Sequence, residues 1–120
     1  MYKVMAFLSR KPGTTIEQLR DYYETRHVPL IGEIAPPMRG YRRNYLKLNE
    51  PFKRNGERID FDVVTEMLFA SEAEYDEWFQ AFSDPDAFRR VVEDEHKFLD
   101  PDSIRVCAVE VAETAYDDAS

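Results

Sequence analysis

The chain contains a single cysteine, Cys107, and therefore has no partner for an internal disulfide. It also lacks a run of about 20 apolar residues, the length that a helix needs to cross a bilayer. From Met1 onwards the residues follow a strand pattern, without the charged, apolar and cleavable regions of a secretory leader. These absences predict a cytoplasmic protein that does not enter the membrane. Cys107 itself lies in the strand-like run at residues 105–109, which predicts a buried thiol rather than a nucleophile.

Positive charge is scarce, because 16 Lys and Arg stand against 24 Asp and Glu and the formal net charge is -8. Binding to nucleic acid or to an anionic membrane normally depends on clustered basic residues, so we expect neither partner. One basic stretch runs from Arg39 to Arg58, but Tyr, Asn and Glu interrupt it. Such a mixture is typical of a solvated strand and loop.

The pattern of apolar residues predicts six elements in the order strand, helix, strand, strand, helix, strand. The predicted strands cover residues 2–9, 40–49, 61–70 and 104–111, and the predicted helices cover residues 16–34 and 72–98. A long hairpin loop is expected at residues 49–60, and residues 113–120 form a short acidic tail. Thr14 with Glu17, and Ser71 with Glu74, have the spacing of capping boxes before the two helices.

Two prolines are expected to interrupt the predicted helices. Pro29 lacks an amide N–H, so a kink or a restarted turn is expected near His27. Asp84 followed by Pro85 has the pattern of an N-cap and a first helical residue, which divides the second helix into two pieces.

This order of elements is the ferredoxin-like βαββαβ arrangement of the α+β class. Its helices cover one face of an antiparallel sheet. Apolar residues also occupy the other face of the strand at 61–70, and that face then needs a second cover. The sequence therefore predicts one domain over residues 1–112 that forms a homodimer through the uncovered face.

Two stretches of the chain resemble the EthD family. They are IEQLRDYYETRHVPL at residues 16–30, with Tyr23, His27 and Pro29 in a tyrosine-to-His-x-Pro pattern, and DPDAFRRVVEDEHKFLD at residues 84–100. The resemblance extends over nearly the whole chain. It implies a dimeric α+β barrel whose two sheets pack face to face, with a pocket in each subunit between the sheet and its own helices.

The resemblance also suggests the kind of function. Proteins similar to this one include ring cyclases, anthrone-type oxygenases and decarboxylases of aromatic polyketides that work without a metal or an organic cofactor, and others have no assigned reaction. We therefore expect a small-molecule ligand and no cofactor. The principal hypothesis is a cofactor-independent enzyme, and the alternative is an accessory protein that binds a small molecule without changing it.

Three residues are candidates for acid–base chemistry. His27 comes first, because it lies on the apolar stripe of its helix and titrates near neutrality; the alternative is a core histidine bonded to a backbone carbonyl. His96 lies at the margin of an apolar face, although neighbouring carboxylates alone would also explain it. Glu66 stands between apolar residues of its strand and needs a partner. That partner is either a histidine or a salt bridge to Arg43 or Lys47 on the neighbouring strand.

Aromatic residues supply the candidate walls of the pocket. The substrate-binding candidates are Tyr23, Tyr45, Trp78 and Phe79, and their alternative role is core packing. The acidic run from Glu93 to Glu95 points in three directions on a helix, which favours a solvated face over a metal site. We predict no metal.

An RNA-binding module shares the order of strands and helices. The strand at 61–70 lacks the glycines and ordered aromatics of an RNA-contacting strand, and the net charge is of the wrong sign. This function is therefore disfavoured.

Overall fold

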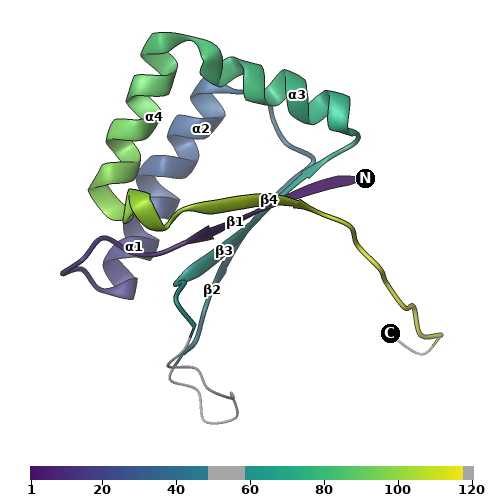
Figure 1. Ribbon diagram of the computed structural model, residues 1–120, viewed down its shortest axis with the longest axis horizontal. Helices are drawn as coiled ribbons and strands as arrows, with labels where there is room; N and C mark the ends of the chain where they lie inside the picture. Colours follow the sequence, from purple (N-terminus) through teal and green to yellow (C-terminus); the bar gives the residue numbers. More distant parts are fainter. Residues whose placement is uncertain (49–58, 118–120) are drawn as a thin grey trace.

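The computed structural model of the chain describes residues 1–48 and 59–117 (Figure 1). Most of the predicted loop at 49–60 and residues 118–120 of the predicted tail lie outside the described residues. Within them, four strands form one antiparallel sheet in the order β2-β3-β1-β4. The strands are β1 (Tyr2–Leu8), β2 (Gly40–Tyr45), β3 (Val63–Phe69) and β4 (Arg105–Val109). This topology confirms the predicted ferredoxin-like α+β fold.

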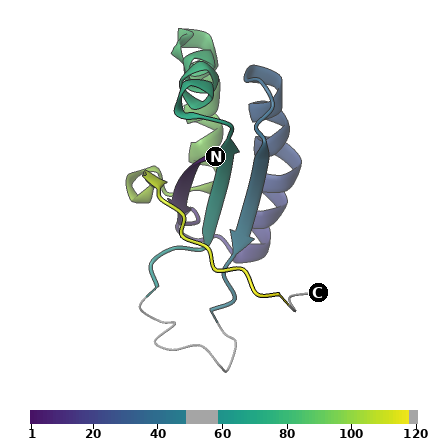
Figure 2. The same cartoon turned by 90° about the vertical axis from the view of Figure 1, so that its right-hand side faces the viewer.

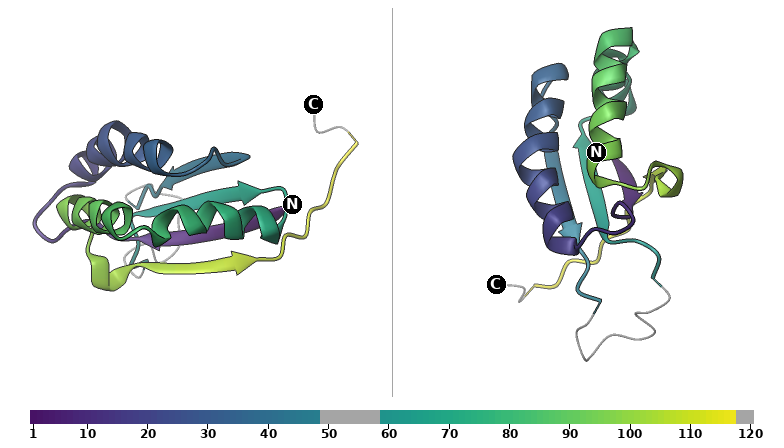
Figure 3. Two further views of the ribbon diagram at one scale, coloured as in Figure 1. Left: turned by 90° about the horizontal axis from the view of Figure 1, so that it is seen from above. Right: turned by 90° about the vertical axis from the view of Figure 1, so that its left-hand side faces the viewer.

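The helices lie on one face of this sheet. They are α1 (Ile16–Tyr22), the π turn η1 (Tyr23–His27), α2 (Val28–Ile34), α3 (Glu72–Gln80), α4 (Pro85–Phe98) and the short 3₁₀ turns η3 (Ala81–Ser83) and η4 (Pro101–Ser103). Figure 2 shows the strands in front of the helices, and the right panel of Figure 3 shows the helices from the opposite side. None of the described helices is long and apolar enough to cross a membrane.

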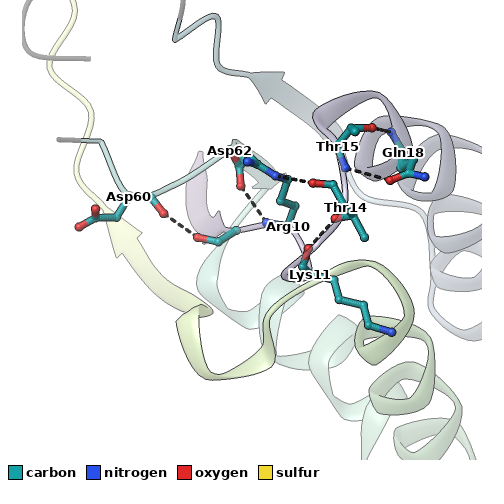
Figure 4. A network of polar contacts seen from close by, with 8 residues as sticks. Arg10, Lys11, Thr14, Thr15, Gln18, Asp60 and Asp62 are labelled. Carbon is teal, nitrogen blue, oxygen red and sulfur yellow. Dashed lines mark hydrogen bonds and ion pairs between the residues drawn. The ribbon is translucent and has the colours of Figure 1, made fainter. Parts of the chain in front are cut away.

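A capping box starts α1, one residue later than the sequence predicted. Thr15 is the N-cap: its hydroxyl accepts from the Gln18 N–H at 3.1 Å, and the Gln18 side chain accepts from the Thr15 N–H at 2.9 Å (Figure 4). The prediction of Thr14 with Glu17 is therefore wrong. Thr14 instead donates to the Lys11 carbonyl at 2.6 Å and closes the preceding turn.

The turn between β1 and α1 is tied to the segment before β3. The backbone angle φ of Gly13 in this turn is +84°, a value that residues with a Cβ atom rarely adopt. The Arg10 backbone N–H donates to Asp62 at 2.8 Å, and its guanidinium donates to the same carboxylate at 2.7 Å (Figure 4). These bonds compensate the buried Asp62 charge and anchor the start of the first helix.

The irregularity predicted near His27 is a π turn. The Val28 N–H donates to the Tyr23 carbonyl, five residues back, and the backbone stays right-handed through this region. Pro29 has no N–H to donate to the carbonyl four residues before it, so the ordinary α ladder is interrupted here. The helix changes pitch without breaking.

The predicted division of the second helix is confirmed. The structure has α3, the 3₁₀ turn η3 and then α4, whose N-cap Asp84 accepts from the Ala87 N–H at 3.0 Å and precedes Pro85. Ser71 caps α3, accepting from the Glu74 N–H at 3.2 Å. The predicted capping box is only half formed, because the Glu74 carboxylate accepts from the Ala70 N–H instead of the Ser71 N–H.

The core lies between the sheet and the helices. Alternate residues of β3 face the helices, and Val63, Thr65 and Phe69 are almost completely buried. The buried cluster consists of Ala6, Leu8, Leu19, Tyr23, Val63, Phe98 and Leu99. Burying a large side chain of this kind stabilises a fold by roughly 1.5–3 kcal/mol.

Glu66 belongs to the opposite face of the sheet. Its carboxylate bonds to Lys3 Nζ at 2.9 Å and Asn44 Nδ2 at 2.9 Å, and Arg42 Nη1 lies 3.7 Å away. A salt bridge across the strands does form, but its cations are Lys3 and Arg42 rather than the predicted Arg43 or Lys47. Arg42 is the residue opposite Glu66, whereas Arg43 faces the helices.

Cys107 lies on this same face and is exposed, so the prediction of a buried thiol is wrong. Cys107 is opposite Met5, whereas its neighbour Val106 is opposite Ala6 and faces the helices. Alternation along β4 therefore directs the thiol towards the face that carries no helix.

Candidate functional site

A cavity of about 400 Å³ lies between the sheet and the helices. Its walls are mainly aliphatic and aromatic. The sheet contributes Ala6, Leu8, Tyr41, Thr65, Met67 and Val106, and the helical side contributes Tyr23, His27, Ile31, Tyr75, Trp78, Phe79, Phe82, Phe88, Val91, Val92 and Glu95. This volume and this lining are typical of small-molecule pockets, which span roughly 300–1,000 Å³.

His27 lines the cavity and is paired with Asp94 of α4. Asp94 Oδ2 lies 2.8 Å from His27 Nδ1. A carboxylate accepts, so Nδ1 carries the proton and Nε2 keeps its lone pair. Burial lowers the pKa of His27 below its ordinary value, and the bond to Asp94 opposes this only in part. The imidazole is therefore neutral near pH 7 and has a basic nitrogen.

Asp94 has a second partner that fixes its orientation. Tyr22 donates its hydroxyl to Asp94 Oδ1 at 2.6 Å, and the Tyr22 ring stacks on Phe98 with centroids 5.1 Å apart. Burial together with the bond to Asp94 raises the pKa of Tyr22 to about 12. One Asp94 oxygen thus accepts a hydrogen bond from His27, and the other accepts one from the Tyr22 phenol.

Glu95, the next residue of α4, lines the cavity as well. Burial raises the pKa of its carboxyl from 4.5 to about 7, and the charge of Asp94 adds to the effect. Among the described residues no hydrogen-bond donor or cation stabilises its charged form. Glu95 is therefore a carboxyl group that titrates near neutrality in the wall of the cavity.

The reading of residues 93–95 as a solvated face is wrong at Asp94 and Glu95. The sequence did contain a signal for Glu95, since it lies four residues after Val91 and four before Leu99 and so falls on the apolar stripe of α4. Only Glu93 of the three is exposed, and it pairs with Arg89 on the same helix.

Two buried tyrosines meet at the sheet side of the cavity. The Tyr23 hydroxyl lies 2.8 Å from Thr65 Oγ1 and accepts from the Tyr41 hydroxyl at 3.3 Å. Burial raises the pKa of both phenols, so both are neutral hydrogen-bonding groups. Tyr41 was missing from the sequence candidates, although alternation along its strand places it on the same face as Arg43 and Tyr45.

Tyr45 does not line the cavity, because its hydroxyl donates to Glu24 Oε2. Arg43 binds the same carboxylate through two nitrogens, at 2.9 and 2.8 Å. These partners, with Arg43 first, lower the pKa of Glu24 to about 2. The network joins β2 to the π turn and thereby helps to hold Tyr23 and His27 in place.

Trp78 and Phe79 belong to the aromatic wall on α3. The Trp78 ring packs against Phe82 with centroids 4.8 Å apart, and its indole N–H is buried without an acceptor in the described part of the chain. Phe79 is 55% exposed and Phe88 on α4 is 58% exposed, although both line the cavity. Two large apolar rings of the lining are thus partly open to solvent.

The structure brings some of the predicted site residues together and separates others. His27, Tyr23, Trp78 and Phe79 share the cavity. His96 is exposed on α4, because it is one residue, about 100° of helical turn, away from Glu95. Glu66 lies beyond the sheet, so the pair of His27 with a glutamate of that strand does not form; His27 pairs with Asp94 instead.

Within residues 1–48 and 59–117, no cluster of three or more His, Cys, Asp or Glu has the arrangement of a metal site. The polar side chains that line the cavity include an oriented imidazole, a carboxyl and three phenols. This combination is able to bind an apolar molecule and to transfer a proton to or from it.

Comparison with known protein families matches residues 11–102 to the EthD domain. Comparison with curated proteins finds no match. Among solved structures, an EthD family protein from Bacillus halodurans is 19% identical with a TM-score of 0.61, covering 93% of this chain and 100% of its own. The protein At3g17210 from Arabidopsis thaliana is 15% identical with a TM-score of 0.62, at 97% and 100% coverage.

A third similar structure is described as a dimeric ferredoxin-like protein of unknown function, from Jannaschia sp. CCS1. It is 15% identical with a TM-score of 0.56, and the alignment covers 92% of this chain and 98% of that one. At such identities the similarity bears on the fold.

Proposed function

The chain belongs to the EthD family, and from this premise we propose that it is a cofactor-independent enzyme acting on an aromatic or otherwise apolar small molecule. The observation that carries the proposal is the His27–Asp94 pair, 2.8 Å apart, at the wall of an apolar cavity. The lyase, cyclase, decarboxylase and oxygenase types all remain open. A step common to many such reactions is removal of a proton from a phenol or from carbon beside a carbonyl.

In this proposal His27 is the catalytic base. Its Nε2 accepts the substrate proton, so that an N–H bond forms as the substrate bond to hydrogen breaks. The resulting imidazolium is stabilised by Asp94, which already holds Nδ1. Tyr23 and Tyr41 are neutral and supply hydrogen bonds at the sheet side of the cavity. The apolar walls exclude water and strengthen each of these interactions.

The first experiment identifies a ligand and then measures turnover. Native mass spectrometry of the purified protein, followed by mild denaturation, releases any bound molecule for analysis. With a compound of that class as substrate, His27→Ala should lower kcat by about 10²–10⁴-fold. His96→Ala is the matched control, since His96 is exposed and should keep full activity. Full activity of His27→Ala would remove His27 from the chemistry.

The second candidate function is a binding or accessory protein that uses the same cavity without chemistry. The aromatic wall with Trp78 and Phe82 favours it, because such a wall supplies binding energy without a titratable group. Product formed in molar excess over protein excludes this candidate. Tight binding of the released compound with no turnover supports it.

We also propose that the chain forms a homodimer through the sheet face that carries no helix. Met5, Phe7 and Val64 point to this face by register and are only partly buried within one chain. Val64→Arg should convert a dimer to a monomer in size-exclusion chromatography with light scattering. Ala73→Arg adds the same charge at an exposed position on α3, on the helix side of the sheet, and serves as the control. A monomeric wild type would contradict the proposal.

A further inference from the structure

The charged residues that line the cavity are acidic and not basic. In the described part of the chain, none of the lining residues is Lys or Arg. The ionisable groups of the lining are His27, Glu95 and the phenols of Tyr23, Tyr41 and Tyr75. A neutral imidazole and neutral phenols provide no positive charge, and Glu95 provides a negative one once it is ionised.

The carboxylates near the cavity differ in how they are compensated. Asp94 accepts from His27 on one oxygen and from Tyr22 on the other, so its charge is already satisfied. Glu95 has no such partner within residues 1–48 and 59–117. A buried carboxylate without a donor gains most from a ligand that brings an O–H or N–H group, and a second anion raises its electrostatic energy further.

We infer that Glu95 is a specificity-determining residue of this cavity, which makes it select uncharged aromatic molecules and reject aromatic carboxylates. The inference rests on the proposed function of the cavity as a small-molecule site. A phenol donates its O–H to the Glu95 carboxylate while its ring contacts the aromatic wall. A carboxylate of the same size meets Glu95 with no cation to balance it. Decarboxylation of an aromatic acid becomes the least compatible of the proposed reactions, because a decarboxylase must admit a carboxylate.

The test compares two probes of nearly equal size, 4-butylphenol and 4-butylbenzoate, at about pH 8, where Glu95 is ionised. Trp78 is the only tryptophan of the chain and lines the cavity, so its fluorescence reports occupancy directly. We expect wild type to bind the phenol at least about tenfold more tightly than the benzoate, a difference of about 1.4 kcal/mol or more. In Glu95→Gln the preference should fall by a similar factor, mainly because the benzoate binds better.

Glu93→Gln is the matched control. It removes the same charge from the same helix at an exposed position and should leave the preference unchanged. Equal binding of the two probes by wild type overturns the inference, and so does a preference that survives Glu95→Gln. Both results leave the small-molecule site itself standing, because the phenol still binds.

Failure of the proposed function gives a different result. Wild type that binds neither probe, with no change in Trp78 fluorescence, overturns the site and the selectivity together. Loss of turnover in His27→Ala with unchanged phenol binding, combined with loss of probe preference in Glu95→Gln, supports both. Turnover of His27→Ala thus tests the proposed function, and the probe preference of Glu95→Gln tests the selectivity.

Discussion

Replacing Glu95 by Gln should stabilise the protein above neutral pH and leave its stability unchanged in acid. Gln has nearly the same shape as Glu and carries no charge, so the substitution removes the cost of an ionised carboxylate in the cavity wall. Burial is the main cause of the raised pKa of Glu95, about 7 against an ordinary 4.5. The effect should therefore follow the ionisation of this one group.

The pH window follows from the direction of the pKa change. Between pH 4.5 and about 7 the folded state holds a proton on Glu95 that the unfolded state has released. The free energy of unfolding of wild type therefore falls as the pH rises through that window, because folding binds a proton that becomes scarcer. The pKa rises from 4.5 to about 7, and each pKa unit is worth roughly 1.4 kcal/mol, so the full difference is at most about 3–4 kcal/mol. Partial contact with solvent reduces it to about 1–2 kcal/mol.

Urea unfolding at about pH 8 and about pH 4.5 measures this difference. At the higher pH, Glu95→Gln should unfold at a urea concentration higher than that of wild type by on the order of 1 M. At the lower pH the two midpoints should coincide, because the wild-type carboxyl is then largely protonated in the folded state and increasingly protonated in the unfolded one. Glu93→Gln should match wild type at both. Equal stabilisation at both pH values, or an equal effect of Glu93→Gln, would refute the reasoning.

Three further predictions concern other parts of the fold. Thr65→Val should destabilise the protein by about 1–3 kcal/mol in urea unfolding, because it removes the closest hydrogen-bond partner of the buried Tyr23 hydroxyl; an unchanged midpoint would mean that this bond contributes nothing. An added Cβ meets no atom within 4 Å at either Gly13 or Gly32, so only the backbone conformation distinguishes the two positions. Gly13→Ala should destabilise the protein by about 1 kcal/mol because the φ of Gly13 is +84°, whereas Gly32→Ala in α2 should stabilise it by about 0.5–1 kcal/mol. Effects of the same sign in urea unfolding would contradict this. Asp94→Asn should lower the pKa of His27 further, as measured by NMR titration. The variant should also lose more stability than wild type as the pH falls below about 6.5, because a histidine whose pKa is lowered in the folded state takes up its proton more readily in the unfolded state. An unchanged or higher His27 pKa would show that the carboxylate is not its partner.

The candidate site was predictable in part. The apolar stripe of the first helix identified Tyr23 and His27, because helical periodicity alone decides which side of an amphipathic helix faces the sheet. The same argument applied strictly to α4 identifies Glu95 as well. The role of Asp94 could not be predicted from the sequence, since it depends on the packing of two helices that are far apart in the chain.

The strand candidates show why pairing register matters. Glu66 was expected to need a partner, and it has one, but the partner is Lys3 together with Asn44 on the strands to either side. A shift of one residue in the pairing of β2 with β3 would place Arg43 opposite Glu66 and turn it away from the helices. Nothing in either strand alone specifies that choice.

The sequence by itself determined the order of the elements, the division of the second helix at Asp84-Pro85 and the helix face that carries His27. Each of these depends on interactions between residues close together in the chain, namely backbone geometry, capping and periodicity. Only the tertiary structure decided that Asp94 orients His27, that Glu95 lines the cavity without a partner and that Glu66 lies on the other side of the sheet. These depend on which elements pack together and in which register, and therefore on the balance of burial over the whole domain.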